Sequence, residues 1–142
     1  MMGGDFLIKS LKASPGCMGV EAAQTQSGKQ VIFAWFENKK AVQAWYGSAT
    51  HTQMMKMMGS PTRPPLVNVK NDKMPIMIIA ALTPTKTPDP NVKIPISQIS
   101  IELYTTVEGG FAYKGRFAPE SLKGMSINDG GAYNPKKDKE GN

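Results

Sequence analysis

The fold is decided by the stretch Gln30-Val-Ile-Phe-Ala-Trp-Phe-Glu-Asn38, which runs on into Lys39-Lys-Ala-Val-Gln-Ala-Trp-Tyr-Gly47 and Ser48-Ala-Thr-His51. Its first part, residues 30–36, is an almost entirely apolar run of strand length, which is typical of a strand covered on both faces. Asn38 is a suitable N-cap for a helix over 39–46, whose apolar residues recur at helical spacing. Gly47 ends that helix, and Ser48 can cap a second helix through Met58.

The sequence on either side of this stretch predicts one more helix and several more strands. Residues 5–12 carry apolar side chains at helical spacing and predict a short helix. Residues 17–24 predict a half-buried strand, and the turn residues 25–29 join it to the apolar strand as a hairpin. Further on, the sequence predicts extended segments, which are Ile76–Leu82, Ile99–Val107 and Phe111–Phe117.

Composition and charge narrow the class of protein. A chain of 142 residues is the size of one domain, and the formal net charge is +6. The Lys and Arg residues are dispersed rather than gathered in a stripe, which argues against a nucleic-acid partner. The longest apolar run, 76–82, is far shorter than the roughly 20 residues that a membrane-spanning helix needs. A single cysteine, Cys17, leaves no intrachain disulfide and fits a cytoplasmic location.

The order of motifs resembles a known family. Trp35 and Glu37 close the apolar strand, Trp45 lies on the following helix, and a Ser48-x-x-His51 step follows. In this order they resemble the antibiotic-biosynthesis-monooxygenase-like proteins of the dimeric α/β-barrel superfamily. The resemblance implies an α+β, ferredoxin-like fold with a C-terminal extension of strands and loops. It also implies a homodimer whose sheets pair face to face, and a small apolar ligand bound without a cofactor.

One departure from the family pattern leads to a structural prediction. The family opens with a strand before its first helix, and residues 1–4 are too short to supply one. We therefore expect Ile76–Leu82 and Ile99–Val107 to fill the first and last strand positions of the sheet. The predicted organisation is a single domain over 1–125, with residues 5–58 as the family-like part and 59–125 as the extension. Residues 126–142 are a polar tail that we expect to be flexible.

His51 is the only histidine, so it is the candidate for any acid–base step that uses an imidazole. The alternative is a polar residue in the first turn of a helix, capped by Ser48. The resemblance implies an apolar substrate pocket, for which the candidate lining residues are Phe33, Trp35, Trp45, Tyr46 and Met54. Their alternative role is plain core packing. The sequence predicts no metal site, because the Met54–Met58 cluster suits packing better than a soft metal ion.

The resemblance thus implies a small-molecule-binding protein similar to cofactor-independent monooxygenases, acting on an apolar aromatic or polyketide-like compound. The competing hypothesis is a non-catalytic dimeric binding or scaffolding module. In that case the pocket is filled by the chain's own extension, whose aromatic residues are Phe111, Tyr113 and Phe117.

Overall fold

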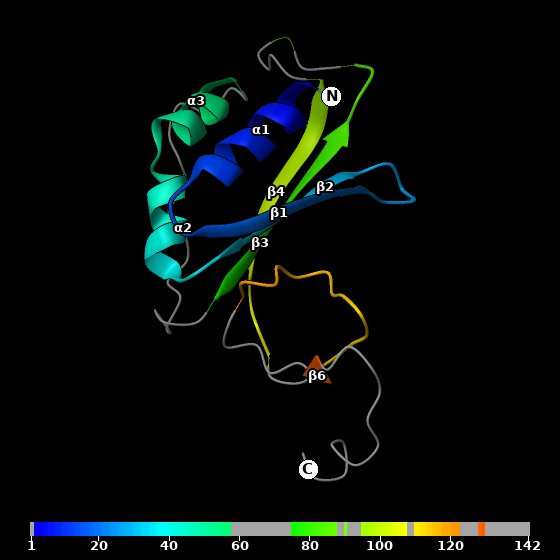
Figure 1. The fold of residues 1–142 in the computed structure, drawn as a ribbon. Helices are drawn as coiled ribbons and strands as arrows, with labels where there is room; N and C mark the ends of the chain where they lie inside the picture. The colour runs from blue at the N-terminus through cyan, green and yellow to red at the C-terminus, as the bar shows by residue number, and fades with distance from the viewer. Residues whose placement is uncertain are drawn as a thin grey trace.

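The computed structural model describes residues 2–57, 75–87, 90, 95–107, 110–122 and 128–129. The described residues form an α+β fold, in which a four-stranded antiparallel sheet has the order β1-β2-β3-β4 (Figure 1). The elements in chain order are α1 (Met2–Ala13), β1 (Cys17–Gln24), β2 (Gln30–Phe36), α2 (Lys39–Tyr46), α3 (Ala49–Met57), β3 (Ile76–Pro84), β4 (Ile96–Thr105), β5 (Phe111–Ala112) and β6 (Asn128–Asp129). The short strands β5 and β6 pair in parallel, apart from the main sheet.

The hairpin of β1 and β2 has the predicted bounds. Its turn is closed by the Thr25 amide, which donates to the Lys29 carbonyl at 2.9 Å. Gly28 in this turn has φ +90°, a left-handed conformation that a residue without a Cβ adopts freely. The β1 strand lies at the edge of the sheet, and β2 lies in the interior between β1 and β3.

The later segments complete the sheet, as the sequence predicts. Strand β3 pairs with β2 from Phe36↔Ile76 to Gln30↔Leu82 and with β4 on its other side. It therefore occupies the position of the family's missing first strand, and β4 occupies that of the last strand, so the fold is ferredoxin-like. The bounds of β4 differ from the predicted 99–107. The ladder begins earlier because the Thr85 amide donates to the Pro95 carbonyl, which aligns the chain for the Pro84↔Ile96 pair.

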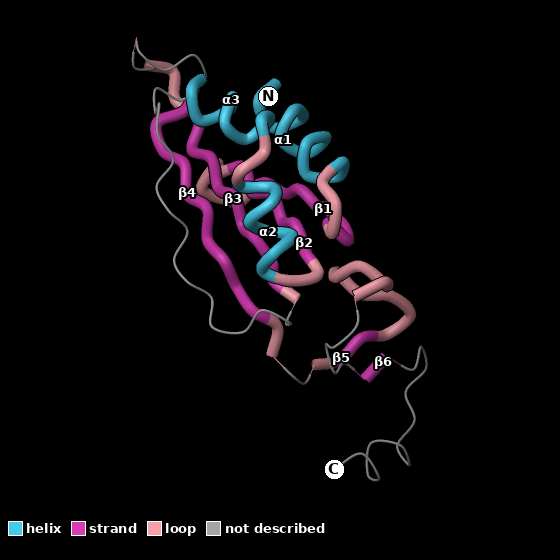
Figure 2. Tube along the Cα trace, turned by 90° about the vertical axis from the view of Figure 1, so that its left-hand side faces the viewer, coloured by secondary structure: helices cyan, strands magenta, loops and turns pink. Residues whose placement is uncertain are grey.

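The helices cover one face of the sheet, which we call the inner face (Figure 2). Alternate residues of β2, namely Ile32, Ala34 and Phe36, point to this face and join the core. The core also includes Leu7 and Leu11 of α1, Val42 and Trp45 of α2, and Ile76, Ile78 and Ala80 of β3. The residues that alternate with them, Val31, Phe33 and Trp35, point to the opposite side of the sheet, which we call the outer face.

Helix boundaries follow from capping. Asn38 has an extended backbone, and its Oδ1 accepts a hydrogen bond from the Ala41 amide at 3.0 Å, which caps α2 as predicted. Ser48 Oγ accepts from the His51 amide at 3.2 Å and caps α3 in the same way. Helix α1 begins at Met2, before the predicted start at Asp5, so that Asp5 lies in its first turn. An acidic side chain there is favourable because helix N-termini carry positive partial charge.

Residues 110–122, which we call the cap, pack on the outer face below the sheet in Figure 1. Arg116 holds the cap together, since its Nη2 donates to the carbonyls of Pro119 and Glu120 at 2.9 Å each. Pro119 lies against the sheet at Gly19, where an added Cβ would come within 2.5 Å of Pro119 Cγ. Close contact between cap and sheet therefore depends on glycine at this position.

The predicted strand over Phe111–Phe117 is wrong. Only Phe111 and Ala112 are extended, as β5. Lys114 has φ 60° and Gly115 has φ 157°, and these positive values turn the chain back toward the sheet. The alternation of aromatic residues in this segment is typical of a strand, but it does not predict the turn at Lys114 and Gly115.

Two further predictions concern the C-terminal tail and the membrane. The predicted tail, residues 126–142, lies outside the described residues apart from positions 128–129. In the described part of the chain, no helix has the length and apolar character needed to cross a membrane.

Gly16, between α1 and β1, provides a test of the packing. It has φ +83°, and an added Cβ would lie 2.5 Å from the Ala41 Cβ of α2. Gly28 has a similar φ but no atom within 4 Å of an added Cβ. Gly28→Ala should therefore lower the free energy of unfolding by about 1–2 kcal/mol, the backbone cost alone. Gly16→Ala should cost about 1–3 kcal/mol more, because it adds overpacking. Urea unfolding of both variants measures the difference; equal losses would contradict the contact.

Candidate functional site

His51 lies in the first turn of α3 and is buried, with 3% of its surface exposed. Its Nδ1 is 2.9 Å from the Tyr46 carbonyl oxygen. A carbonyl oxygen only accepts, so Nδ1 carries the proton and donates in this contact. When the imidazole is neutral, this arrangement puts its lone pair on Nε2. The short connection between α2 and α3 thus fixes both the orientation of the ring and its tautomer.

Two aromatic rings of α2 enclose the imidazole. The ring centroids of Trp45 and Tyr46 each lie 4.6 Å from that of His51. Trp45 is 2% exposed, and its Nε1 is buried without a hydrogen-bond partner among the described residues. A buried N–H without an acceptor is costly, and such a group is a position where a ligand oxygen would be bound favourably. The imidazole of His51 and the indole of Trp45 thus lie side by side, both buried.

Met54 is buried one helical turn after His51, but it packs in a different group. Its neighbours are Leu82 of β3 and Ile96 of β4, with Met57 partly buried beside them. This small cluster closes the end of the inner face that lies under α3. Met54 therefore fills the core in the described structure, which is the alternative role considered from the sequence.

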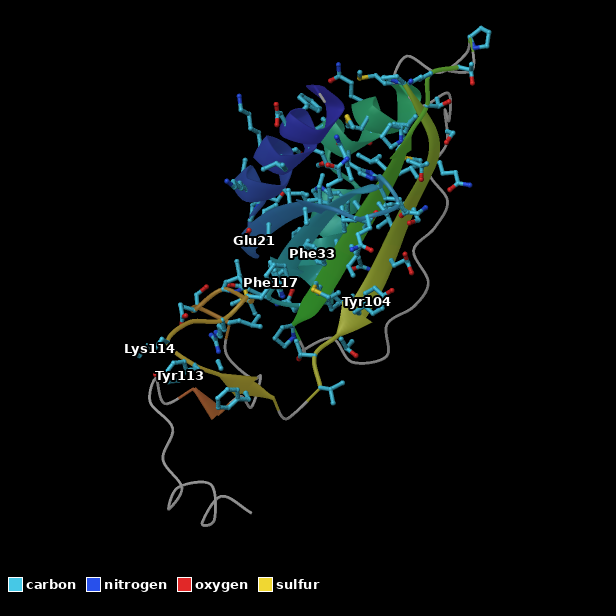
Figure 3. The ribbon with its side chains drawn as sticks, turned by 90° about the vertical axis from the view of Figure 1, so that its right-hand side faces the viewer. Glu21, Phe33, Tyr104, Tyr113, Lys114 and Phe117 are labelled. Atoms are coloured by element: carbon cyan, nitrogen blue, oxygen red, sulfur yellow. The ribbon has the colours of Figure 1, made fainter. Side chains whose placement is uncertain are left out.

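Phe33 and Trp35 lie on the outer face, across the sheet from His51. Phe117 of the cap packs against both, at ring-centroid distances of 4.9 Å from Phe33 and 5.2 Å from Trp35, in edge-to-face geometry. Figure 3 shows Phe117 beside Phe33 at the lower edge of the sheet. The structure thus brings Trp45, Tyr46 and His51 together and separates them from Phe33 and Trp35.

A cavity of about 380 Å³ lies between the outer face and the cap. Trp35, Met77 and Tyr104 line it from three adjacent strands, and the cap supplies Phe111, Arg116, Phe117 and Ala118. Its remaining lining residues are Thr105, Thr106 and Gly110. Sequence reasoning missed Met77, Tyr104 and Arg116 as site residues. Alternation along β3 and β4 could place Met77 and Tyr104 on one face of the sheet, but no local signal in the sequence links Arg116 to that face.

Polar groups at this cavity are few. The Tyr104 hydroxyl donates to Glu102 Oε1 at 2.9 Å, and this hydrogen bond, with the negative charge of Glu102, raises the pKa of Tyr104. Tyr104 thus keeps its proton at neutral pH. Thr106 Oγ1 is buried without a hydrogen-bond partner among the described residues. Over the same residues, no group of three or more His, Cys, Asp or Glu side chains is placed to hold a metal ion.

Comparison with known proteins places the hairpin and helices in a family. The family model described as antibiotic biosynthesis monooxygenase matches residues 6–57. These residues belong to that family. The match runs from α1 to the end of α3, and it includes Trp35, Trp45 and His51. No curated protein and no solved structure matches the chain.

Within the antibiotic-biosynthesis-monooxygenase domain, the matched residues supply the hairpin, most of α1, and α2 and α3, which are the described helices on the inner face. Strands β3 and β4 and the cap lie outside the matched range. The His51 cluster is therefore built by the family domain, whereas the outer cavity is built jointly by this domain and the chain's own extension.

Cys17, at the start of β1, is half-buried and is not in a disulfide. Burial raises the pKa of its thiol, and the contact with the Gly19 carbonyl lowers it by less. The folded protein therefore favours the neutral Cys17 thiol, which contributes to the free energy of unfolding. This contribution is complete below the unfolded pKa and is lost as pH rises through the folded pKa, above about pH 9. The alkylation rate with iodoacetamide should reach half its maximum at higher pH in the native protein than in urea. Coincident pH profiles would contradict this.

Proposed function

We propose that this chain is a small-molecule-binding protein of the antibiotic biosynthesis monooxygenase type, and that it oxygenates an apolar aromatic or polyketide-like compound with O₂ and no bound cofactor. The observation that supports this most directly is the pairing of His51 and Trp45. A buried imidazole of fixed tautomer lies 4.6 Å, centroid to centroid, from an indole whose N–H has no described partner.

In the proposed reaction, His51 Nε2 takes a proton from an activated CH₂ group that is flanked by aromatic rings, as in an anthrone. The resulting carbanion transfers one electron to O₂, and the two radicals combine to give a peroxide. Loss of water then leaves a carbonyl, so that CH₂ and O₂ become C=O and H₂O. The Trp45 N–H would donate to the oxyanion of the deprotonated substrate. Exclusion of water from the buried site protects the carbanion from being protonated again before it reacts with O₂.

A second candidate function is a non-catalytic binding module. The contact of Phe117 with Phe33 and Trp35 favours it, because two of the predicted substrate-binding residues are in contact with the chain's own cap. In this case His51 has the structural role of joining α2 to α3 through the Tyr46 carbonyl. Turnover, or its absence, separates the two functions.

We further propose that two copies pair through the outer face beside the cap, where Phe117 of the cap contacts Phe33 but leaves the rest of the row open. One row of this face runs Glu21, Phe33, Ile79 and Glu102 across the strands, with apolar residues at its centre and carboxylates at both ends. An apolar centre with a polar rim is typical of a protein interface. A cytoplasmic location belongs to the same proposal, since a half-buried free thiol such as Cys17 persists in a reducing compartment.

The test of the oxygenase is the His51→Asn variant. An Asn side chain can still donate to the Tyr46 carbonyl but has no basic nitrogen, so the fold should persist while kcat falls by about 10²-fold or more. The measurement is O₂ consumption with 1,8-dihydroxyanthrone, corrected for its uncatalysed oxidation, together with the absorbance of the quinone. Tyr113→Ala, an exposed change in the cap, is the control and should keep full activity. Wild-type O₂ uptake at the uncatalysed rate would instead favour the binding module.

The homodimer is tested at Ile79. Ile79→Glu should weaken self-association at least about 30-fold, because it buries a third carboxylate in a row already bordered by two. Val107→Glu is the control, since Val107 is 79% exposed and lies beyond the end of β4. Sedimentation at micromolar concentration should show dimers for the wild type and the control. A monomeric wild type would contradict the proposal.

A further inference from the structure

The cavity under the cap has the features of a ligand site, and it is separate from the His51 cluster. Its volume of about 380 Å³ is within the range of small-molecule pockets. Its walls are mostly aromatic and aliphatic, and they come from two parts of the chain that are far apart in sequence. The sheet lies between this cavity and His51, so a ligand here would not contact the imidazole.

The aromatic residues around the cavity are unusually exposed for their size. Phe117 is 60% exposed although it contacts two rings of the sheet, and Phe111 is 66% and Tyr104 43% exposed. Three rings therefore border one hollow and each keeps a large free surface. A flat apolar molecule would cover these surfaces together, and Trp35 at the floor would offer it a further ring edge.

One polar group makes the cavity selective. Thr106 is one of its lining residues, and the Oγ1 atom of Thr106 is buried in the wall without a described hydrogen-bond partner. A hydroxyl both donates and accepts, so rotation of the Thr106 side chain toward the cavity would let it pair with either kind of group on a ligand. The Arg116 guanidinium also lines the cavity, but the carbonyls of the cap hold its Nη2, and Glu120 lies 3.8 Å from its Nε. The guanidinium is thus already engaged within the cap, and the site suits a neutral ligand.

We propose that the cavity between the outer face and the cap binds a neutral, planar aromatic molecule that carries one hydrogen-bonding group. The rings of Phe111, Phe117 and Trp35 contact its faces and edges, and Thr106 Oγ1 pairs with its polar group. The cap is part of the site rather than only a cover. Binding here is independent of the oxygenation proposed at His51.

The test uses N-phenyl-1-naphthylamine, a neutral aromatic amine with one N–H, whose fluorescence rises in apolar surroundings. The full chain should bind it with a micromolar Kd. Phe117→Ala should weaken binding at least tenfold, whereas Tyr113→Ala should change the Kd less than twofold. Tyr113 is the matched control because it belongs to the same cap and is 55% exposed, but it does not line the cavity.

Two further variants separate binding from folding. Ala118→Phe fills the cavity from the cap and should abolish binding at an unchanged melting temperature. Thr106→Val removes the unpaired hydroxyl without changing the shape of the side chain. It should raise the melting temperature while weakening binding three- to tenfold, a combination that a purely structural role would not produce.

Equal affinity in the wild type, Phe117→Ala and Ala118→Phe would overturn the proposal. A Kd that weakens as the protein concentration rises would also overturn it, since a second copy would then cover the cavity. His51→Asn should leave the Kd unchanged. The failure of the oxygenase proposal is therefore distinguishable from the failure of this one.

Discussion

The pairing of β2 with β3 is the interaction on which both faces of the sheet depend. It runs without interruption over seven residue pairs, from Gln30↔Leu82 to Phe36↔Ile76. In the family pattern the neighbour of this strand precedes the first helix, but here it comes from residues 76–84. Without it, the backbone groups of an apolar interior strand would be unpaired, which is costly and promotes aggregation. The family domain therefore depends on the extension to complete its sheet.

This sheet divides the molecule into two chemical environments. The inner face carries a packed core, and beside it the buried His51 contacts Trp45 and Tyr46, so any chemistry there would take place in buried, preorganised surroundings. The outer face is covered only partly, and its aromatic residues remain open to a ligand or a second copy. The two faces can serve different functions because strand alternation sends neighbouring residues of β2, such as Trp35 and Phe36, to opposite sides.

The sequence was sufficient to predict β1, β2, α2 and the N-cap residues of α2 and α3. Each of these is specified by local alternation, helical spacing or a capping side chain. It also predicted which segments complete the sheet, since an unpaired interior strand demands a partner. It did not predict the fold of residues 110–122, the segment that we call the cap. The turn at Lys114 and Gly115 and the hydrogen bonds from Arg116 to the carbonyls of Pro119, Glu120 and Leu122 are local features that no spacing or turn motif of the sequence marks. The sequence also did not separate the six candidate site residues into two groups. Alternation shows that Trp35 and Phe36 point to opposite sides of the sheet, but it does not show which side the helices cover.

The register of this strand pair also links the core to the outer cavity. Trp35 lies opposite Met77, and Met77 lies opposite Tyr104, so the cavity floor is one row of the ladder. A slip of one residue would move Trp35 to the helix side and expose Phe36, which is now fully buried. The burial of Phe36 therefore stabilises the same register that forms the floor. A substitution that disturbs the core at Phe36 or Ile76 should alter the outer cavity as well, even though no residue of the inner-face core lines it.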